Sequence, residues 1–257
     1  MSVIWCMLYR LHLATGNHLF KRLHHKYIAR VLNSLNAPLL LDNHCLFGGG
    51  TAIALRFGEY RESVDIDFLV SDIECYRNLR QLMTSSSGIV AILREGAETL
   101  EQSRPVRADQ YGIRTMLLVD NYPIKFEIVL EGRIQLENPD PQDEICGITI
   151  LTPLDMVTSK LLANSDRWRD DAVFGRDLID LAMIEPNRKL MQVAIAKAEE
   201  AYGHSIRNDL DKAIDRMQTE DDWMERCMQA LSIEIPKALL WQKVRTVRSR
   251  FSPKRTS

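Results

Sequence analysis

Alternation of apolar and polar residues predicts a small β-sheet within the first 150 residues. In residues 64–70 the apolar side chains of Val64, Ile66 and Phe68 alternate with Asp65 and Asp67, which should point the same way from one strand. Two more β runs, 113–119 and 124–130, flank a segment whose Asp-Asn-Tyr-Pro composition suits a hairpin turn. A last short strand is expected over residues 146–151.

Helical patterns surround these runs. Apolar residues at three-and-four spacing predict an amphipathic helix within residues 19–35, with Leu23 on its apolar stripe. Residues 51–57 read as a short helix after a glycine turn, and Ser71 has the spacing of a capping box that opens a helix running to about residue 83.

The chain beyond residue 151 carries only helical signals. Thr152-Pro153 is an N-cap followed by a proline in the first turn, and stop signals recur near Pro186, Gly203 and Pro236. The predicted fold class is therefore α+β (α/β). A small mixed sheet flanked by helices should occupy residues 1–150, and a helical domain residues 151–257.

Composition narrows the class of protein. The 257 residues carry 33 Lys+Arg and 35 Asp+Glu, a net charge of −2, which excludes a generally basic nucleic-acid binder and a disordered polyampholyte. Five scattered cysteines without a C-x-x-C pair indicate a reducing compartment, and no apolar run approaches the ~18 residues of a membrane span. We expect a cytoplasmic protein.

The candidate chemistry lies in a glycine turn and three carboxylates. Gly48-Gly49-Gly50-Thr51 separates a strand from a helix, where backbone N–H groups can approach phosphate oxygens. Asp65 and Asp67 project in parallel, and Glu127 on another strand could add a third ligand for a two-metal site. Taken singly, these pieces are ordinary, since a D-x-D is commonly a solvent-facing edge and three glycines are commonly a loop. Their combination favours a site for a divalent metal and a triphosphate.

The order of these motifs resembles the AbiEii/AbiGii toxin family of nucleotidyltransferases, in the polymerase β-like nucleotidyltransferase superfamily. The matching blocks are GGTAIAL at 49–55, SVDIDFLV at 63–70 and TPLDMVTSKLLA…GRDLIDLAMI at 152–184. The resemblance implies a minimal nucleotidyltransferase fold with appended helices. It also implies Mg²⁺ as cofactor and a nucleoside triphosphate as substrate.

Carried over to this sequence, the resemblance assigns roles to single residues. It implies that the phosphate-cradling turn is Gly49, Gly50 and Thr51, and that Asp65 and Asp67 are catalytic metal ligands. Glu127 stands where the superfamily commonly has a third acid. The resemblance further places Lys160 near the triphosphate and identifies Asp177, followed by Asp180, as the aspartate of the last motif.

Without the resemblance, the sequence does not decide the roles of the charged residues in the block at 152–184. On a helix from Pro153, Lys160 and Arg167 share a face, so Lys160 could neutralise phosphate or be a solvated lysine. Asp177 and Asp180, three residues apart, could equally pair with Lys160 as a structural feature.

The function expected from the sequence is metal-dependent transfer of a nucleotidyl group from a nucleoside triphosphate to an acceptor hydroxyl. By resemblance the protein is the toxin of a toxin–antitoxin or phage-defence pair, with RNA, including the tRNA 3′ end, as acceptor and an antitoxin protein as partner. The alternatives are a small-molecule nucleotidyltransferase of the antibiotic-modifying kind, a D-x-D glycosyltransferase and a catalytically degenerate binding module.

A basic cluster near the C-terminus supports an RNA acceptor. It lies on a helix expected over residues 235–251, whose apolar stripe should include Ala238 and Leu239. The cations fall within thirteen residues that contain no acid: Lys243, Arg245, Arg248, Arg250, Lys254 and Arg255. A frayed, solvated tail is the alternative reading of this cluster.

Overall fold

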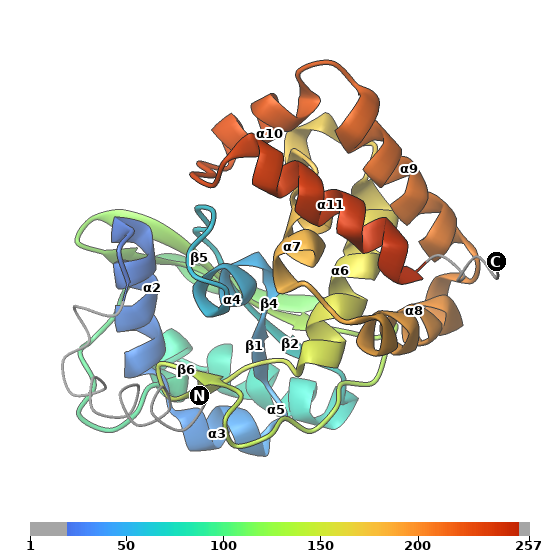
Figure 1. Cartoon of the computed structure of the whole chain (residues 1–257). Coiled ribbons are helices and arrows are strands. Elements are labelled where there is room, and N and C mark those ends of the chain that lie inside the picture. The colour runs from blue at the N-terminus through green and yellow to red at the C-terminus, as the bar shows by residue number, and fades with distance from the viewer. Residues whose placement is uncertain (1–19, 252–257) are drawn as a thin grey trace. The chain divides into compact units, whose positions relative to one another are not determined.

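A computed structural model describes residues 20–251, and its contacts divide the chain into two compact units (Figure 1). The sheet unit comprises the chain up to Glu59 together with Ser63–Glu131 and Pro139–Ile150. The helical unit comprises Tyr60–Glu62, Gly132–Asn138 and the chain from Leu151 onward. Two short segments of the first part of the chain therefore belong to the helical unit.

The sheet unit is built on a five-stranded mixed sheet in the order β1-β2-β5-β4-β3. Its central pair, β2 and β5, is parallel, and the other neighbours are antiparallel. The strands are β1 (Leu46–Gly48), β2 (Ile66–Val70), β3 (Glu101–Ala108), β4 (Gly112–Val119) and β5 (Tyr122–Leu130). The predicted mixed sheet is thus confirmed.

One face of this sheet is the core of the unit. Phe47, Phe68 and Phe126 form a row across β1, β2 and β5, with neighbouring ring centroids 5.5 and 5.6 Å apart. All three side chains are fully buried, which fixes the register because a one-residue slip would turn them to the other face. Val64 was expected on this face, but it precedes β2 and is 39% exposed.

The hairpin of β4 and β5 confirms its prediction. Asp120 and Asn121 have φ angles of 50° and 66°, the left-handed values of a two-residue turn whose twist matches the strands. The strand expected over 146–151 is confirmed only in β7 (Ile148–Thr149), since Cys146 and Gly147 form a turn between it and β6 (Glu144–Ile145). Pattern alone could not separate this pair, because neither strand is long enough to alternate.

Four helices and one 3-10 turn accompany the sheet in the described part of this unit. They are α2 (Leu23–Ser34), α3 (Ala37–Asp42), α4 (Gly49–Arg56), α5 (Ile73–Met83) and the 3-10 turn η1 (Gly88–Ile92). Leu23 is 50% exposed at the start of α2 and is not part of its apolar stripe. The cap of α5 is Asp72, not Ser71, because its carboxylate accepts from the backbone N–H of Cys75.

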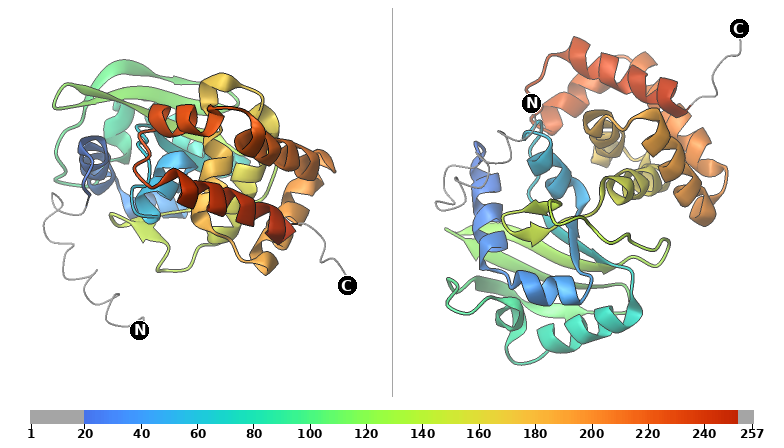
Figure 2. Two further views of the ribbon diagram at one scale, coloured as in Figure 1. Left: turned by 45° about the horizontal axis from the view of Figure 1, so that its top comes forward. Right: turned by 60° about the horizontal axis from the view of Figure 1, so that its bottom comes forward.

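The helical unit contains six helices in its described part and one 3-10 turn. They are α6 (Pro153–Arg167), η2 (Asp171–Val173), α7 (Arg176–Ile184), α8 (Arg188–Tyr202), α9 (Ser205–Thr219), α10 (Trp223–Ala230) and α11 (Lys237–Phe251). Helix α6 packs against α7, α8 and α9, and α11 packs against the same three helices (Figures 1 and 2). Thr152 caps α6 as predicted, its hydroxyl accepting from the N–H of Asp155.

Helix α11 buries a narrower stripe than the sequence suggested. Leu240, Val244, Val247 and Phe251 are buried, whereas Ala238 and Leu239 are exposed. The first turn of α11 therefore lacks the neighbours that its apolar residues led us to expect. None of the helices in residues 20–251 is long and apolar enough to cross a membrane.

Candidate active site

The glycine turn lies at the junction of β1 and α4, directly beside Asp67. Gly48 pairs with Asp67 across the antiparallel strands, and Gly49 has a left-handed φ of 66°. A Cβ on Gly49 would lie 2.6 Å from Oδ2 of Asp67 and 2.9 Å from its Cβ. Only glycine combines this backbone conformation with so close an approach. The turn and the carboxylate are thus built against each other.

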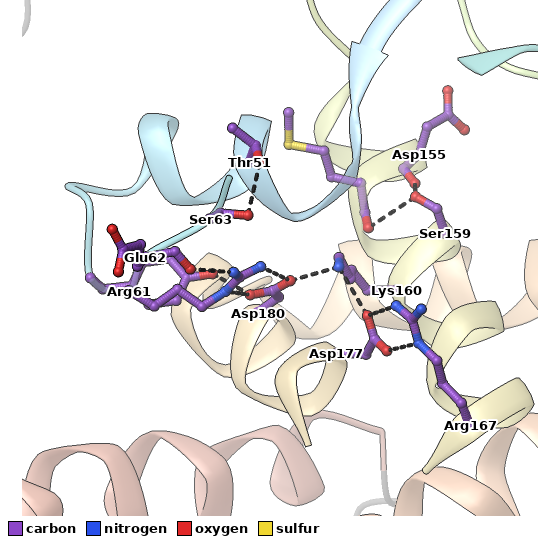
Figure 3. Close-up of polar contacts among 12 residues, drawn as sticks. Thr51, Arg61, Glu62, Ser63, Asp155, Ser159, Lys160, Arg167, Asp177 and Asp180 are labelled. Carbon is purple, nitrogen blue, oxygen red and sulfur yellow. Dashed lines mark hydrogen bonds and ion pairs between the residues drawn. The ribbon is translucent and has the colours of Figure 1, made fainter. Parts of the chain in front are cut away.

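The N-terminus of α4 is partly exposed and has no side-chain cap. Gly48 caps the helix without a side chain, so the first-turn N–H groups depend on other partners. Gly49 and Gly50 are partly exposed there, while Thr51 is buried. The Thr51 hydroxyl donates to Oγ of Ser63 at 2.8 Å (Figure 3). In this structure Thr51 therefore ties the turn to the segment that leads into Asp65.

The three carboxylates predicted in the sheet unit lie on one face of its sheet, opposite the aromatic core. Asp67 is directly paired with Glu127 on the neighbouring parallel strand, so their side chains project the same way. Asp65 lies just before β2, two residues from Asp67, and both are half-buried.

Two cations hold Glu127: Lys125 from the same strand face and Arg114, which the sequence did not indicate. Lys125 Nζ and Arg114 Nε each lie 2.5 Å from a different oxygen of its carboxylate. Burial alone would raise the pKa of Glu127, but the hydrogen bonds from Lys125 and Arg114 outweigh it and hold the pKa below its usual value. Glu127 is thus a charged carboxylate with its oxygens already engaged.

Lys125 also interacts electrostatically with both carboxylates of the D-x-D pair. Burial lowers the pKa of Lys125, but its hydrogen bond to Glu127 and the charges of Glu127, Asp67 and Asp65 raise it overall. The ammonium therefore stays protonated among three carboxylates. Alternation along residues 124–130 already predicts that Lys125 and Glu127 share a strand face, and their ion pair confirms it.

A buried histidine braces the segment before Asp65. His25 Nδ1 lies 2.8 Å from Oε1 of Glu59, and its Nε2 accepts from the backbone N–H of Ser63 at 3.3 Å. Glu59 also accepts from the backbone N–H groups of Lys21 and Arg22, just before α2. One neutral tautomer of His25 satisfies both of its contacts. No sequence pattern indicated this link.

The helical unit holds the remaining predicted residues in a buried ionic network (Figure 3). Lys160 Nζ lies 2.9 Å from Oδ1 of Asp177 and 2.6 Å from Oδ2 of Asp180. Arg167 makes two hydrogen bonds to Asp177, at 2.7 and 3.0 Å. Arg61 binds both oxygens of Asp180, at 2.7 and 3.0 Å. The expected common face of Lys160 and Arg167 is confirmed, since both reach Asp177.

Electrostatics within this network favour ionised aspartates. Burial would raise the pKa of Asp177, but Lys160 and Arg167 hold it well below its usual range. Asp180 is fully buried, yet Arg61 and Lys160 likewise lower its pKa. Three cations against two carboxylates leave the cluster with a net charge of +1. Arg61 is 119 residues from Asp180 in sequence, so no local signal could have paired them.

The residues predicted for the site therefore form two separate groups, one in each unit. The sheet unit brings together Gly49, Asp65, Asp67 and Glu127, and the helical unit brings together Lys160, Asp177 and Asp180. The role of each residue in substrate binding stays a prediction.

Comparison with known proteins decides the family. The sequence model described as "Nucleotidyl transferase AbiEii toxin, Type IV TA system" matches residues 30–246. The chain belongs to this family. It is accordingly a nucleotidyltransferase of a toxin–antitoxin family, as the order of its motifs suggested.

Other comparisons add little. No curated protein matches this AbiEii-family chain. A crystal structure from H. pylori, described as a candidate nucleotidyltransferase, is similar over 88% of this chain and 94% of that one, with 20% identity and a TM-score of 0.46. That likeness is too distant to carry an argument about substrates.

The resemblance implies Mg²⁺, and the carboxylates of the sheet unit can be compared with the ligands that this ion requires. Within residues 20–251 no group of three or more His, Cys, Asp or Glu side chains is arranged to hold a metal ion. Asp65 and Asp67 still offer two carboxylates side by side, and Mg²⁺ in phosphate-transfer sites commonly takes one or two carboxylates plus substrate and water oxygens. These two residues fit such an ion. Glu127 would fit as a third ligand in competition with Lys125 and Arg114, which each engage one of its oxygens.

Proposed function

We propose that this AbiEii-family enzyme transfers a nucleotidyl group from a nucleoside triphosphate to a hydroxyl of RNA, with the tRNA 3′ end as the first acceptor to test. In cells it would act as a toxin controlled by a cognate antitoxin and serve in phage defence. The observation that carries the proposal is the contact of Gly49 with Asp67, which puts a helix N-terminus beside a carboxylate pair.

The residues of the sheet unit would divide the work of donor binding. Backbone N–H groups at Gly49 and Gly50 would bind phosphate oxygens, aided by the partial positive charge of the α4 N-terminus. Asp65 and Asp67 would hold Mg²⁺, which supplies charge neutralisation at the phosphates when bound. The acceptor oxygen would bond to the α-phosphorus as its proton passes to solvent water, while the bond from that phosphorus to the leaving pyrophosphate oxygen breaks.

Glu127 and Lys160 would have different roles in this mechanism. Glu127, with a lowered pKa and two cationic partners, is poorly suited to take the proton of the acceptor hydroxyl. Lys160 would contribute positive charge to the triphosphate, as the resemblance implies, with Asp177 and Asp180 fixing its position. Lys160→Arg should rescue only part of the activity lost in Lys160→Met, because a planar guanidinium does not fill the place of an ammonium.

The direct test incubates the purified protein with each labelled triphosphate, Mg²⁺ and total RNA, and follows transfer of label to RNA. Asp65→Asn and Asp67→Asn should each abolish transfer while leaving the thermal unfolding curve nearly unchanged. Asp42→Asn, an exposed carboxylate at the end of α3, is the matched control and should retain full activity. Wild-type turnover in both D-x-D variants would contradict the proposal.

The same assay separates the alternatives. Label transferred to a polyhydroxylated small molecule instead of RNA would indicate an antibiotic-type enzyme. Nucleotide binding without transfer to either acceptor would indicate a degenerate binding module.

A further inference from the structure

The outer strand of the sheet, β3, carries two arginines on the same face as the carboxylates. Arg104 is paired with Met116 and Arg107 with Arg114, so β3 advances three residues where β4 advances two. In a regular strand, residues 104 and 107 would point to opposite faces. The extra residue is a bulge, and it turns both arginines to the face of Arg114.

Side-chain hydrogen bonds brace this bulge. The carbonyl of Arg104 accepts from the hydroxyl of Thr115 at 2.7 Å and from the side-chain amide of Gln102 at 2.8 Å. Pro105 follows within the strand, where it also prevents a further strand from pairing at this edge. The direction of the two arginines is thus fixed by the backbone rather than left to a mobile loop.

These arginines stand at the end of a charged row that begins at the site. Arg107, Arg114, Glu127 and Asp67 are successive partners across β3, β4, β5 and β2. Three strand spacings of ~4.8 Å put Arg107 about 14 Å from Asp67. Lys125 and Arg114 lie between these ends and are engaged with Glu127.

Arg104 and Arg107 differ from the other cations of this row in lacking acidic partners. Both are exposed, and neither side chain forms an ion pair or a hydrogen bond within the part of the chain that the structure describes. The whole chain has a net charge of −2, so this positive end is a local feature. Unpaired arginines at an edge attract phosphates, because no internal salt bridge must first be broken.

The C-terminal basic cluster is less suited to this task than the sequence implied. Lys243 is paired with Glu185 at 2.5 Å, and Arg248 with Asp211 and Asp215 at 2.9 and 2.6 Å. Lys254 and Arg255 lie outside the described residues. Arg245 and Arg250 are its only described cations without an acidic partner among residues 20–251.

We propose that Arg104 and Arg107 bind the phosphate backbone of the acceptor RNA while its reacting hydroxyl lies at Asp65 and Asp67. This inference rests on the proposed function and deepens it. It names the surface that would bind an RNA acceptor and that a small-molecule acceptor would not reach. A small hydroxyl compound held at the carboxylates would have no use for cations ~14 Å away. A polyanion would gain two phosphate contacts there.

The test compares two double variants for binding of a fluorescent single-stranded RNA over a series of salt concentrations. Arg104→Gln/Arg107→Gln should weaken binding and flatten the plot of log K against log salt by about 1.4, at ~0.7 for each lost phosphate contact on a single strand. The matched control is Arg245→Gln/Arg250→Gln on α11, which also removes two unpaired arginines. It should leave the slope unchanged, and both variants should bind Mg²⁺ and triphosphate as the wild type does.

Each other outcome overturns the inference in a recognisable way. Flattening in the α11 variant alone would move the RNA to the C-terminal cluster. Unchanged slopes in both variants, with RNA bound by the wild type, would show that the β3 arginines serve another partner. Wild-type protein that transfers a nucleotide only to a small molecule would remove the RNA acceptor itself, and activity lost in Asp67→Asn would still mark the catalytic site.

Discussion

The contact between Gly49 and Asp67 is the most constrained feature of the site at the scale of single residues. Two conditions meet at Gly49, a left-handed φ of 66° and a side chain 2.6 Å from where a Cβ would be. Gly58, at the other end of α4, meets only the first: its φ is 87°, and nothing lies within 4 Å of its Cβ position. Comparing substitutions at Gly49 and Gly58 therefore distinguishes the effect of backbone strain from the effect of displacing Asp67.

Gly49→Ala should destabilise the protein and also reduce activity. A non-glycine residue in the left-handed region costs about 1–3 kcal/mol, and the new methyl group must also push the Asp67 carboxylate from its place. Gly58→Ala should lose stability through backbone strain alone and retain wild-type turnover. Unfolding by denaturant and nucleotidyl transfer measured on both variants would check this, and equal turnover in the two would show that the position of Asp67 is not critical.

Lys125 gives a second prediction at this scale, because its ammonium lies among the carboxylates that would receive Mg²⁺. Its raised pKa keeps it protonated near neutral pH, so it repels an incoming divalent ion. Lys125→Met should therefore bind Mg²⁺ severalfold more tightly in titration calorimetry without nucleotide. Lys26→Met on α2 is the control, and weaker Mg²⁺ binding in Lys125→Met would contradict this role.

The sequence identified the residues of the site better than their partners. Gly49, Asp65 and Asp67 could be singled out because local pattern places them on a turn and one strand face. Arg114 could not be singled out, because it meets Glu127 only through the register of β4 and β5. Side-chain partners far apart in sequence depend on tertiary packing, which a single sequence does not display.

At the scale of elements, α6 and α7 are joined by buried ion pairs that make the helical unit sensitive to acid. Lys160 and Arg167 on α6 hold the pKa of Asp177 on α7 below that of an unfolded aspartate, near 3.9. A lowered folded-state pKa gives stability that is present above the unfolded pKa and lost as the pH falls toward the folded one. The stabilisation should thus be complete near neutral pH and decline below about pH 4.

Asp177→Asn should cost about 3–5 kcal/mol at neutral pH, because it leaves Lys160 and Arg167 short of a buried counter-charge. The gap in unfolding free energy from the wild type should narrow as the pH falls below about 4, because there the Asp177 carboxylate of the unfolded wild-type chain takes up a proton while the folded one stays ionised. Asp221→Asn, an exposed carboxylate, is the control. A gap that stays constant with pH would show that the loss comes from packing and not from charge.

Elements were predictable where local chemistry determines them. The hairpin of β4 and β5 and the cap of α6 follow from turn residues and a Thr-Pro pair. Strand β3 was not predicted, because Glu101–Ala108 is polar, contains a proline and is bulged, so it lacks the apolar alternation that marks a strand. It is held by pairing with β4, a tertiary effect. The strand that pattern missed is the one that carries Arg104 and Arg107.

At the scale of the whole molecule, the residues assigned to the donor come from both units. Gly49, Asp65 and Asp67 belong to the sheet unit and Lys160 to the helical unit. Substitutions in either unit should therefore weaken binding of the triphosphate. A ligand that binds only the folded state stabilises it by RT ln(1 + [L]/Kd), about 2.7 kcal/mol at a hundredfold excess over Kd. Thermal unfolding with a Mg²⁺-bound triphosphate measures this directly.

The expected result is a rise in the unfolding temperature of the wild type with its preferred triphosphate and Mg²⁺, which a chelator reverses. Asp67→Asn and Lys160→Met should each lose the rise, because one removes a metal ligand and the other a charge at the phosphates. Asp42→Asn and Lys189→Met, both at exposed positions, should keep it. Lys160→Met that unfolds at a lower temperature yet shows the full ligand-induced rise would assign Lys160 to the ionic network with Asp177 and Asp180 alone. The donor's phosphates would then be bound by the sheet unit without it.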